Sequence, residues 1–395
     1  MFSKIKYNLT NDSTFSFIIL VASLFFGNAI VSIAITLFCV FIFFTKKKIS
    51  KYSFPILSLG IYFLANLLGV IINFIESKDV LIIHKFLLFG LIPLLFHSYI
   101  PLKISFRKIK SFYVYAAAIS SLICLVYNLL FPVSEELTFD AITYKFLSRP
   151  FNVHPIYYSL YLILACIFLI DTIFDSKKNK FVSIITFIFL STMVFFLSSR
   201  SAFFTYFVVI IIKLYFTDSV SKVIFLKSLV FITLLVMSSI VLSPKLKDRI
   251  FKLDENQLSY SGLNFRYKIW KNSFELCKKS IIKGYGYQNS RQVLQNYYKE
   301  VNFRRAFIRK LNSHNQYLQS TLDSGVIGLA SLLLMLISPF LIKHTSLNFK
   351  LFVLICIIAF ITESFLRRQI GIAFFVGFYL FFALENNYFG IKQNY

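Results

Sequence analysis

The sequence predicts an all-α, polytopic membrane protein with about 12 transmembrane helices and one large, mainly helical loop. Two observations predict this class. Of the 395 residues, 57% are hydrophobic and only 15% are charged, whereas a soluble domain has about 25% charged residues. The apolar residues also form a series of stretches, each close to the roughly 20 residues that a helix needs to cross a bilayer. A soluble globule is therefore excluded, and the 50 Phe and 23 Tyr exclude a disordered chain.

The first apolar stretch, Phe15 to Phe44, is too long for one ordinary span. Gly27 and Asn28 lie in its middle and are typical of a turn. Lysines flank both ends of the stretch, and basic residues mark the cytoplasmic side of a membrane segment. We therefore expect a hairpin of two short helices. No cleavable signal peptide is expected, because apolar sequence continues without a small-residue cleavage site.

Ten further stretches each predict one crossing, and with the hairpin they place both termini in the cytoplasm. Basic residues of the short loops are concentrated on that side, as the positive-inside rule requires. We expect residues 1–395 to form a single integral membrane domain. The ten predicted spans are 54–74, 81–100, 111–131, 154–171, 182–198, 201–216, 225–242, 317–342, 350–364 and 370–385.

The large loop covers residues 243–316, between the ninth and tenth predicted spans on the outer side. It carries 16 basic and five acidic residues, so much of the formal net charge of +25 lies where an anionic, membrane-bound ligand would dock. Most of the remaining basic residues mark the cytoplasmic side of the membrane. Nucleic acid is therefore not an expected partner. An amphipathic helix is predicted over 264–279. The run Gly284-Tyr285-Gly286-Tyr287 then breaks it, without the spacing of a nucleotide-binding loop.

Arginines at the outer surface are the first candidates for a site. Arg200 lies between Ser199 and Ser201 at the junction of two spans. It could be an interfacial arginine that extends toward the headgroups, or an anion ligand, because a guanidinium beside hydroxyls and a helix start can bind phosphate. Arg367 and Arg368 lie in the turn before the last span.

Each of the other arginines also has a structural alternative. Glu363 precedes Arg367 by four residues, so a local ion pair could fix the last hairpin. Arg266 and Trp270 share one face of the predicted loop helix. They could form a surface cation–π pair, or they could bind phosphate and a lipid or sugar ring.

His314 and Asn315 lie where the large loop meets the next span. A histidine there could cap the helix, or it could accept a proton from a sugar hydroxyl. Gly325 and Gly328 are small positions one turn apart that would let a neighbouring helix approach closely. By contrast, His154 precedes a proline that opens a helix, which indicates a structural role. No metal site and no cofactor are expected, because no cluster has ligand spacing.

The run His314-Asn315, nine residues, Gly325, two residues and Gly328 resembles the signature of the O-antigen ligase and O-antigen polymerase family. The helix plan, with one large loop before the third-last helix, also fits, and the resemblance covers most of residues 180–385. One departure is Ala202-Phe203 after Ser201, where some ligases have Gly-Ala-Trp. Three further features agree with the family in order: Ser199-Arg200-Ser201, Arg266 with Trp270, and Lys283-Gly284-Tyr285-Gly286-Tyr287.

The resemblance implies a metal-independent glycosyltransferase of the GT-C type in the bacterial inner membrane, with its active site facing the periplasm. The donor would be a glycan on undecaprenyl pyrophosphate. Arg200 and Arg266 would hold the pyrophosphate, and His314 would activate or orient the acceptor hydroxyl in an inverting attack. The substrate-binding residues would be Asn315, Ser199, Ser201, Trp270, Arg367 and Arg368.

Three functions stay open at this point. Transfer to a lipid A-core acceptor is slightly favoured over polymerisation of lipid-linked repeat units, and ligase and polymerase differ in the acceptor. A flippase or transporter for lipid-linked glycans is less favoured. Transport predicts ionisable residues at mid-membrane and repeated halves, whereas the candidates gather at the outer face.

Overall fold

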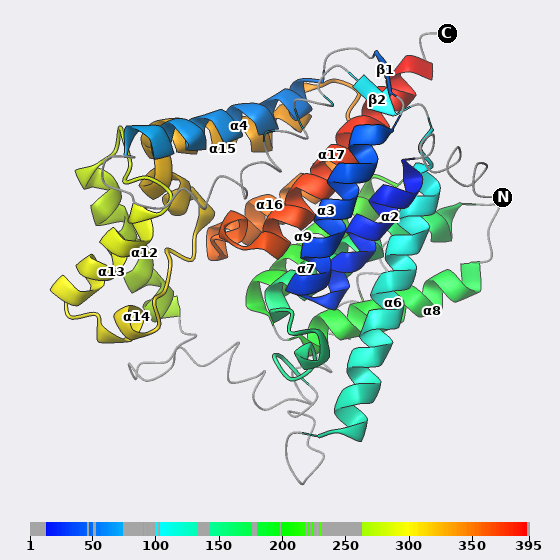
Figure 1. Ribbon diagram of the computed structural model, residues 1–395. Coiled ribbons are helices and arrows are strands. Elements are labelled where there is room, and N and C mark those ends of the chain that lie inside the picture. Colours follow the sequence, from blue (N-terminus) through cyan, green and yellow to red (C-terminus); the bar gives the residue numbers. More distant parts are fainter. Residues whose placement is uncertain are drawn as a thin grey trace. The chain divides into compact units, whose positions relative to one another are not determined.

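The computed structural model is almost wholly helical (Figure 1). It describes residues 13–45, 47–49, 53–73, 99–101, 103–132, 143–175, 180–197, 199–217 and 263–392, together with single residues at 90, 93, 96, 220, 221, 223, 227 and 230. The described chain divides into two compact units. One comprises residues 1–47 and 101–252, and the other comprises residues 48–100 and 253–395.

The first unit begins with the predicted hairpin. Its turn is confirmed at Gly27, whose φ of 89° only glycine adopts at no cost. Pro155 opens α7 in the first turn, as expected, where a missing N–H costs nothing. The elements of this unit are α2 (Thr14–Ser23), η1 (Leu24–Phe26), α3 (Asn28–Phe44), α6 (Phe106–Leu130), η5 (Arg149–Phe151), α7 (Pro155–Phe174), α8 (Lys180–Phe196) and α9 (Arg200–Tyr215).

Helix α7 is the centre of the first unit, where it packs against α6, α8 and α9. Its tyrosines are fully buried, and hydrogen bonds link α7 to the neighbouring helix α6. Tyr158 shares a hydrogen bond of 2.9 Å with Ser120 of α6. Tyr113 of α6 donates to the carbonyl of Tyr161 at 3.0 Å. Polar side chains therefore fix the register of helices that are otherwise apolar.

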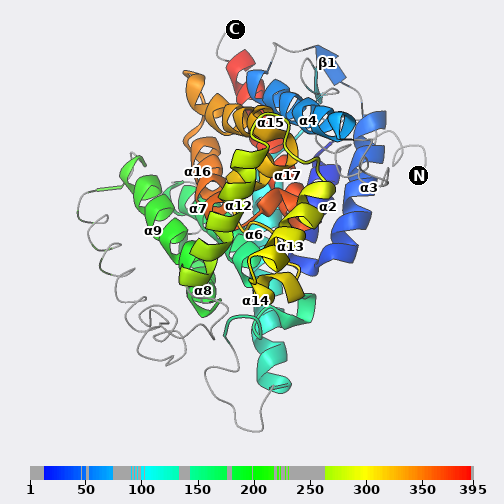
Figure 2. The same cartoon turned by 90° about the vertical axis from the view of Figure 1, so that its left-hand side faces the viewer.

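The second unit holds the last three predicted spans and the described part of the large loop. Figures 1 and 2 show α4 and α15 side by side, with α12, α13 and α14 at the end of the pair where α4 ends. Its helices are α4 (Phe54–Ile72), α12 (Leu263–Lys279), α13 (Asn289–Glu300), α14 (Arg304–Ile308), α15 (Gln316–Leu341), α16 (Leu347–Thr362), η6 (Phe365–Arg367) and α17 (Gln369–Lys392). Two short strands, β1 (Lys47–Ile49) and β2 (Tyr99–Pro101), pair with each other.

Helix α15 is broken at Ser324 and Gly325, where the backbone leaves helical geometry. The turns before the break bury polar side chains such as Gln316, Gln319 and Asp323, and the turns after it are mainly apolar. The break therefore divides a polar helix start from a segment suited to a lipid environment.

Most of the predicted helices are confirmed, and the chain is a multi-pass membrane protein. Among the described residues, five helices are long and apolar enough to cross a bilayer: α4, α6, α7, α15 and the first part of α17. The count of about 12 crossings, the single domain and the sidedness stay predictions. The predicted spans 81–100 and 225–242 and the loop segment 243–262 lie almost wholly outside the described residues.

Candidate functional site

A buried carboxylate joins two of the predicted catalytic residues. Glu363, the residue after α16, has its side chain 7% exposed. Its Oε1 accepts from Nη2 of Arg266 at 3.4 Å, and its Oε2 lies 3.3 Å from Nδ1 of His314. Arg266 also donates from Nη1 to the carbonyl of Thr362 at 3.0 Å. Two segments far from Glu363 in sequence thus converge on this one acid, which can hold a cation and an imidazole in fixed positions.

The backbone at His314 adopts the left-handed region, with φ of 45°, which is uncommon for a residue with a side chain. Two hydrogen bonds hold it there. The side chain of Asn312 accepts from the His314 N–H at 3.1 Å, and the indole N–H of Trp270 donates to the His314 carbonyl at 3.2 Å. Trp270 therefore fixes the histidine from α12, four residues after Arg266.

Asn315 caps α15. Its side-chain oxygen accepts from the N–H of Leu318 at 3.0 Å, and its amide donates to the carbonyl of Ile361 at 3.1 Å. The helix start and the end of α16 are thereby tied together beside His314. The cap explains why an asparagine follows the histidine, because Asn is among the best N-cap residues.

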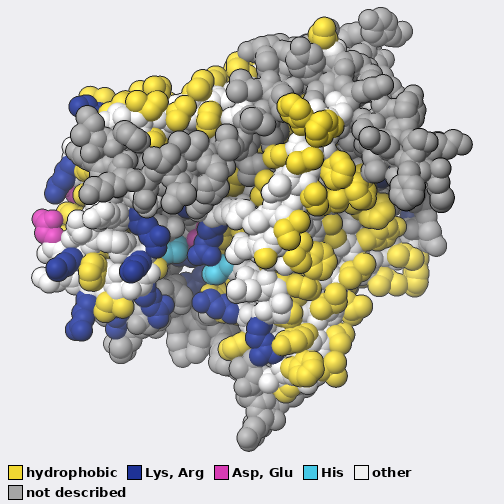
Figure 3. Space-filling model, viewed as in Figure 1, with side chains coloured by type: hydrophobic (Ala, Val, Ile, Leu, Met, Phe, Trp, Pro, Cys, Tyr) yellow, Lys and Arg dark blue, Asp and Glu magenta, His cyan; other side chains and the backbone are white. Residues whose placement is uncertain are grey.

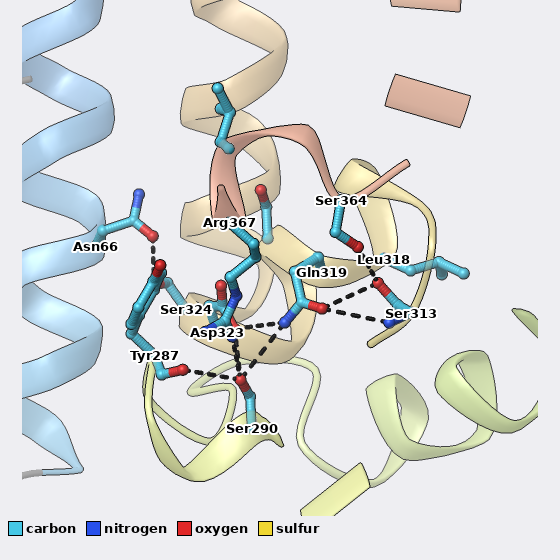
Figure 4. A network of polar contacts seen from close by, with 12 residues as sticks. Asn66, Tyr287, Ser290, Ser313, Leu318, Gln319, Asp323, Ser324, Ser364 and Arg367 are labelled. Carbon is cyan, nitrogen blue, oxygen red and sulfur yellow. Dashed lines mark hydrogen bonds and ion pairs between the residues drawn. The ribbon is translucent and has the colours of Figure 1, made fainter. Parts of the chain in front are cut away.

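Arg367 lies in a second polar network, with its side chain 12% exposed. It pairs with Asp323 of α15 and donates to Ser290 of α13. Asp323 also accepts from Ser290 at 2.6 Å and from Gln319 at 2.9 Å. The guanidinium lies 3.9 Å above the ring of Tyr287 (Figure 4). Burial raises the pKa of the Tyr287 phenol, and the neighbouring Arg367 offsets part of that effect.

These contacts correct the local interpretation of Arg367. Instead of the expected pair within the last hairpin, Arg367 bonds Asp323, and Glu363 bonds Arg266 and His314. Arg266 likewise pairs with a buried acid, Glu363. Trp270, one helical turn later, donates its indole N–H to the backbone carbonyl of His314. Arg368 is exposed at the start of α17.

The Gly-Tyr-Gly-Tyr segment packs into the break of α15. The N–H groups of Tyr285 and Gly286 donate to the carbonyls of Leu322 and Asp323 at 2.7 and 2.9 Å, and the N–H of Val326 donates to the carbonyl of Ile281 at 2.7 Å. Backbone groups that a continuous helix would satisfy are thus satisfied by the loop, as buried groups must be.

The glycines make this approach possible. A Cβ on Gly325 would lie 2.1 Å from the carbonyl oxygen of Ile282, and one on Gly284 would lie 2.6 Å from the N of Gly325. A Cβ on Gly328 would meet the carbonyl of Ser320 of the same helix at 2.6 Å. The expectation of a close neighbouring helix is therefore wrong for Gly325, because the close neighbour is loop backbone.

Arg200 lies in the first unit, at the first residue of α9, with Ser199 as N-cap. The hydroxyls of Ser199 and Ser201 lie 3.4 Å apart, and both side chains are half-buried. This is the predicted junction of two helices, with the cation at the N-terminal end of α9.

Sequence reasoning missed the roles of Glu363 and Asp323. A carboxylate inside or next to an apolar span needs a partner, and that signal was present at both positions. Cys277 is not a candidate nucleophile, because burial raises the pKa of its thiol to about 12 and the reactive form is the thiolate.

Residues 185–333 match the O-antigen ligase family, a family of glycosyltransferase-like membrane enzymes. The match confirms the predicted resemblance over these residues. It includes Arg200, Arg266, Trp270 and His314, and it ends before Glu363. No curated protein matches the chain.

Proposed function

We propose that this O-antigen ligase family chain transfers a glycan from undecaprenyl pyrophosphate to an acceptor hydroxyl at the periplasmic face of the bacterial inner membrane. The observation that carries the proposal is the convergence of Arg266 and His314 on Glu363. It supports transfer from a pyrophosphate to a hydroxyl, because an anion ligand and a proton acceptor lie next to each other at the N-terminal end of α15.

The resemblance to the family assigns Arg266 and Arg200 to the donor pyrophosphate. Glu363 and the carbonyl of Thr362 take two of the five N–H donors of Arg266, and its side chain is 30% exposed. The remaining donors can meet phosphate oxygens, and the permanent charge stabilises the leaving pyrophosphate. Ser199 and Ser201 add hydroxyl donors beside Arg200. Arg368, which is exposed beside η6, is a further candidate ligand of the donor, whereas Arg367 acts through Asp323 as a positioning residue.

His314 accepts the proton of the acceptor hydroxyl. When Nδ1 donates to Glu363, Nε2 on the opposite edge of the ring carries the lone pair. The acceptor oxygen then forms a bond to the anomeric carbon, and the bond from that carbon to the phosphate oxygen breaks. Undecaprenyl pyrophosphate leaves with the electron pair, and the anomeric centre is inverted. No metal takes part, because the arginines supply the positive charge. Asn315 holds the helix start that positions this histidine.

Ligation to lipid A-core is the first candidate for the acceptor, and polymerisation of lipid-linked repeat units is the second. Deletion of the gene followed by lipopolysaccharide gel analysis separates them. Bare lipid A-core, with polymer still made on the lipid carrier, identifies a ligase. Core that carries a single repeat identifies a polymerase. An unchanged pattern would assign the chain to another glycan.

Two substitutions test the chemistry directly. His314→Ala and Arg200→Ala are each expected to abolish transfer while membrane insertion stays normal, because one removes the proton acceptor and the other an anion ligand. Lys299→Ala, on the exposed side of α13, is the matched control and should keep full activity. Near-normal transfer by either site variant would contradict the proposal.

A further inference from the structure

The turn between α12 and Gly284 combines exposed apolar and basic side chains. Residues 278–283 read Lys-Lys-Ser-Ile-Ile-Lys, and we name them the anchor turn. Ile281 and Ile282 are 54% and 69% exposed, and the three lysines are exposed as well. Two adjacent isoleucines exposed to water lose the free energy that burial of their side chains would give. Such a pair is typical of a surface that contacts a partner.

The anchor turn has a fixed place in the second unit. The carbonyl of Ile281 accepts from the N–H of Val326 at 2.7 Å, and the carbonyl of Ile282 faces Gly325. Within the turn, Ser280 Oγ donates to the carbonyl of Gly284 at 2.7 Å. The isoleucines are therefore fixed beside the break of α15.

The break of α15 lies beside the C-terminal end of α4, at the point where the apolar part of α15 begins. After it, residues 326–341 of α15 rise about 24 Å at 1.5 Å per residue, close to the roughly 30 Å hydrocarbon core. On α4, Gly69 packs against Ser324 at the break, and α4 ends three residues later. Gly286 touches Asn73, the residue that follows α4. If residues 326–341 cross the bilayer, the break lies near the boundary between the hydrocarbon core and the headgroups.

The apolar side chains of the turn continue those of α15. Val326 and Ile327, directly after the break, are 48% and 47% exposed. Figure 3 shows apolar side chains over α4 and α15 and Lys and Arg side chains over the adjacent loop helices. The anchor turn thus joins a lipid-facing surface to a basic one.

We infer that the anchor turn inserts Ile281 and Ile282 into the bilayer surface, and that Lys278, Lys279 and Lys283 bind anionic phospholipid headgroups there. Apolar side chains flanked by lysines are what the boundary between headgroups and acyl chains takes up. Three cations match an anionic lipid layer better than an apolar face of a second copy. The turn then holds α12, and with it Arg266 and Trp270, at the membrane surface. This inference does not depend on the proposed reaction.

Depth-dependent quenching tests the insertion. The full chain is reconstituted in vesicles of phosphatidylethanolamine and phosphatidylglycerol. An environment-sensitive fluorophore is attached to the cysteine of Ile282→Cys. The partly exposed Cys39 is replaced by Ala so that it does not react with the label, and the other four native cysteines are buried. The matched control is Ile308→Cys in α14, where the native side chain is 62% exposed. We expect quenching by lipid-borne nitroxide at position 282 several-fold above that at 308, and the reverse for aqueous iodide.

Equal iodide quenching at both positions, without nitroxide quenching, would overturn insertion. Protection of position 282 from both quenchers would overturn it too, because protein would then cover the turn.

A second experiment tests the lysines. The affinity for phosphatidylglycerol, measured by native mass spectrometry, is expected to fall about fivefold for each lysine of the anchor turn replaced by Gln. Replacing Lys268, Lys299 and Lys310, which are exposed on the same loop, should have little effect. If the variant with all three anchor-turn lysines replaced and the variant with all three control lysines replaced lose affinity for phosphatidylglycerol equally, the headgroup site is overturned.

Discussion

Glu363 Oε2 lies 3.3 Å from His314 Nδ1, a contact between residues 49 positions apart. The acid is buried, and its other oxygen meets Arg266. An acid in this position selects the imidazole tautomer and fixes the ring plane. Under the proposed function this contact makes Glu363 a positioning residue, whereas the sequence offered it only a local ion pair with Arg367 as one alternative.

Replacing Glu363 by Gln is therefore expected to lower the turnover number by about ten- to hundredfold. The amide keeps the shape of the side chain but removes the charge that Arg266 and His314 share. The donor KM should change less than the turnover number, because the second proposed pyrophosphate ligand, Arg200, is unchanged. Turnover and KM are measured with purified protein and lipid-linked donor in vesicles.

Two variants make this result specific. Glu275→Gln removes an exposed carboxylate of α12 that pairs with Lys278, and it should leave turnover unchanged. Glu363→Asp should restore part of the lost activity, since it restores the charge. Wild-type turnover in Glu363→Gln would show that the contact has no part in the reaction.

Trp270→Phe separates two roles of the indole. Phenylalanine keeps an aromatic platform but loses the N–H that donates to the His314 carbonyl. Because this bond helps to hold a left-handed backbone, we expect a loss of stability of about 1 kcal/mol and a clear fall in turnover. Thermal unfolding in detergent and the transfer assay measure the two effects. Full activity in Trp270→Phe with none in Trp270→Ala would assign the ring itself to substrate binding.

The helices could be predicted because their signals are local. An apolar run, the Gly27-Asn28 turn and the proline at 155 each act within a few residues. The amphipathic pattern of 264–279 likewise gave α12, although the apolar Phe274 within that segment is 51% exposed. Local patterns thus predict which segments are helical better than they predict which face each residue occupies.

The partners of the charged residues could not be predicted in this way. Glu363 is four residues from Arg367, and this short separation allowed a local pair as one alternative. In the folded chain, residues from α12 and the end of the large loop reach Glu363, and Asp323 reaches Arg367. Such choices depend on how the loop packs on α15, and nothing in the local sequence records that packing.

The ion pair of Asp323 and Arg367 gives a stability prediction. Both side chains are nearly buried, so removing one partner leaves an uncompensated charge. Asp323→Asn and Arg367→Met should each destabilise the protein by about 3–5 kcal/mol. The double variant should lose less than the sum of the two, because no charge is left unpaired. Midpoints of thermal unfolding in detergent give the comparison, and strict additivity would contradict coupling of the pair.

Gly325→Ala tests whether the loop really packs into the break of α15. The substitution places a Cβ 2.1 Å from the carbonyl oxygen of Ile282. The backbone there has φ of 63° and ψ of −154°, a conformation that glycine adopts readily and that costs another residue about 1–3 kcal/mol. Gly60→Ala is the control, because a Cβ there meets nothing within 4 Å and alanine favours a helix interior by about 0.5–1 kcal/mol. We expect Gly325→Ala to lower the unfolding temperature and to make the 281–286 segment sensitive to protease, while Gly60→Ala raises the temperature slightly. The result that would contradict this packing is an equal unfolding temperature for Gly325→Ala and Gly60→Ala. The clash between the new Cβ and the carbonyl of Ile282 should disrupt the hydrogen bonds of Tyr285, Gly286 and Val326 across the break. Unchanged stability would therefore show that these bonds do not hold the loop in place.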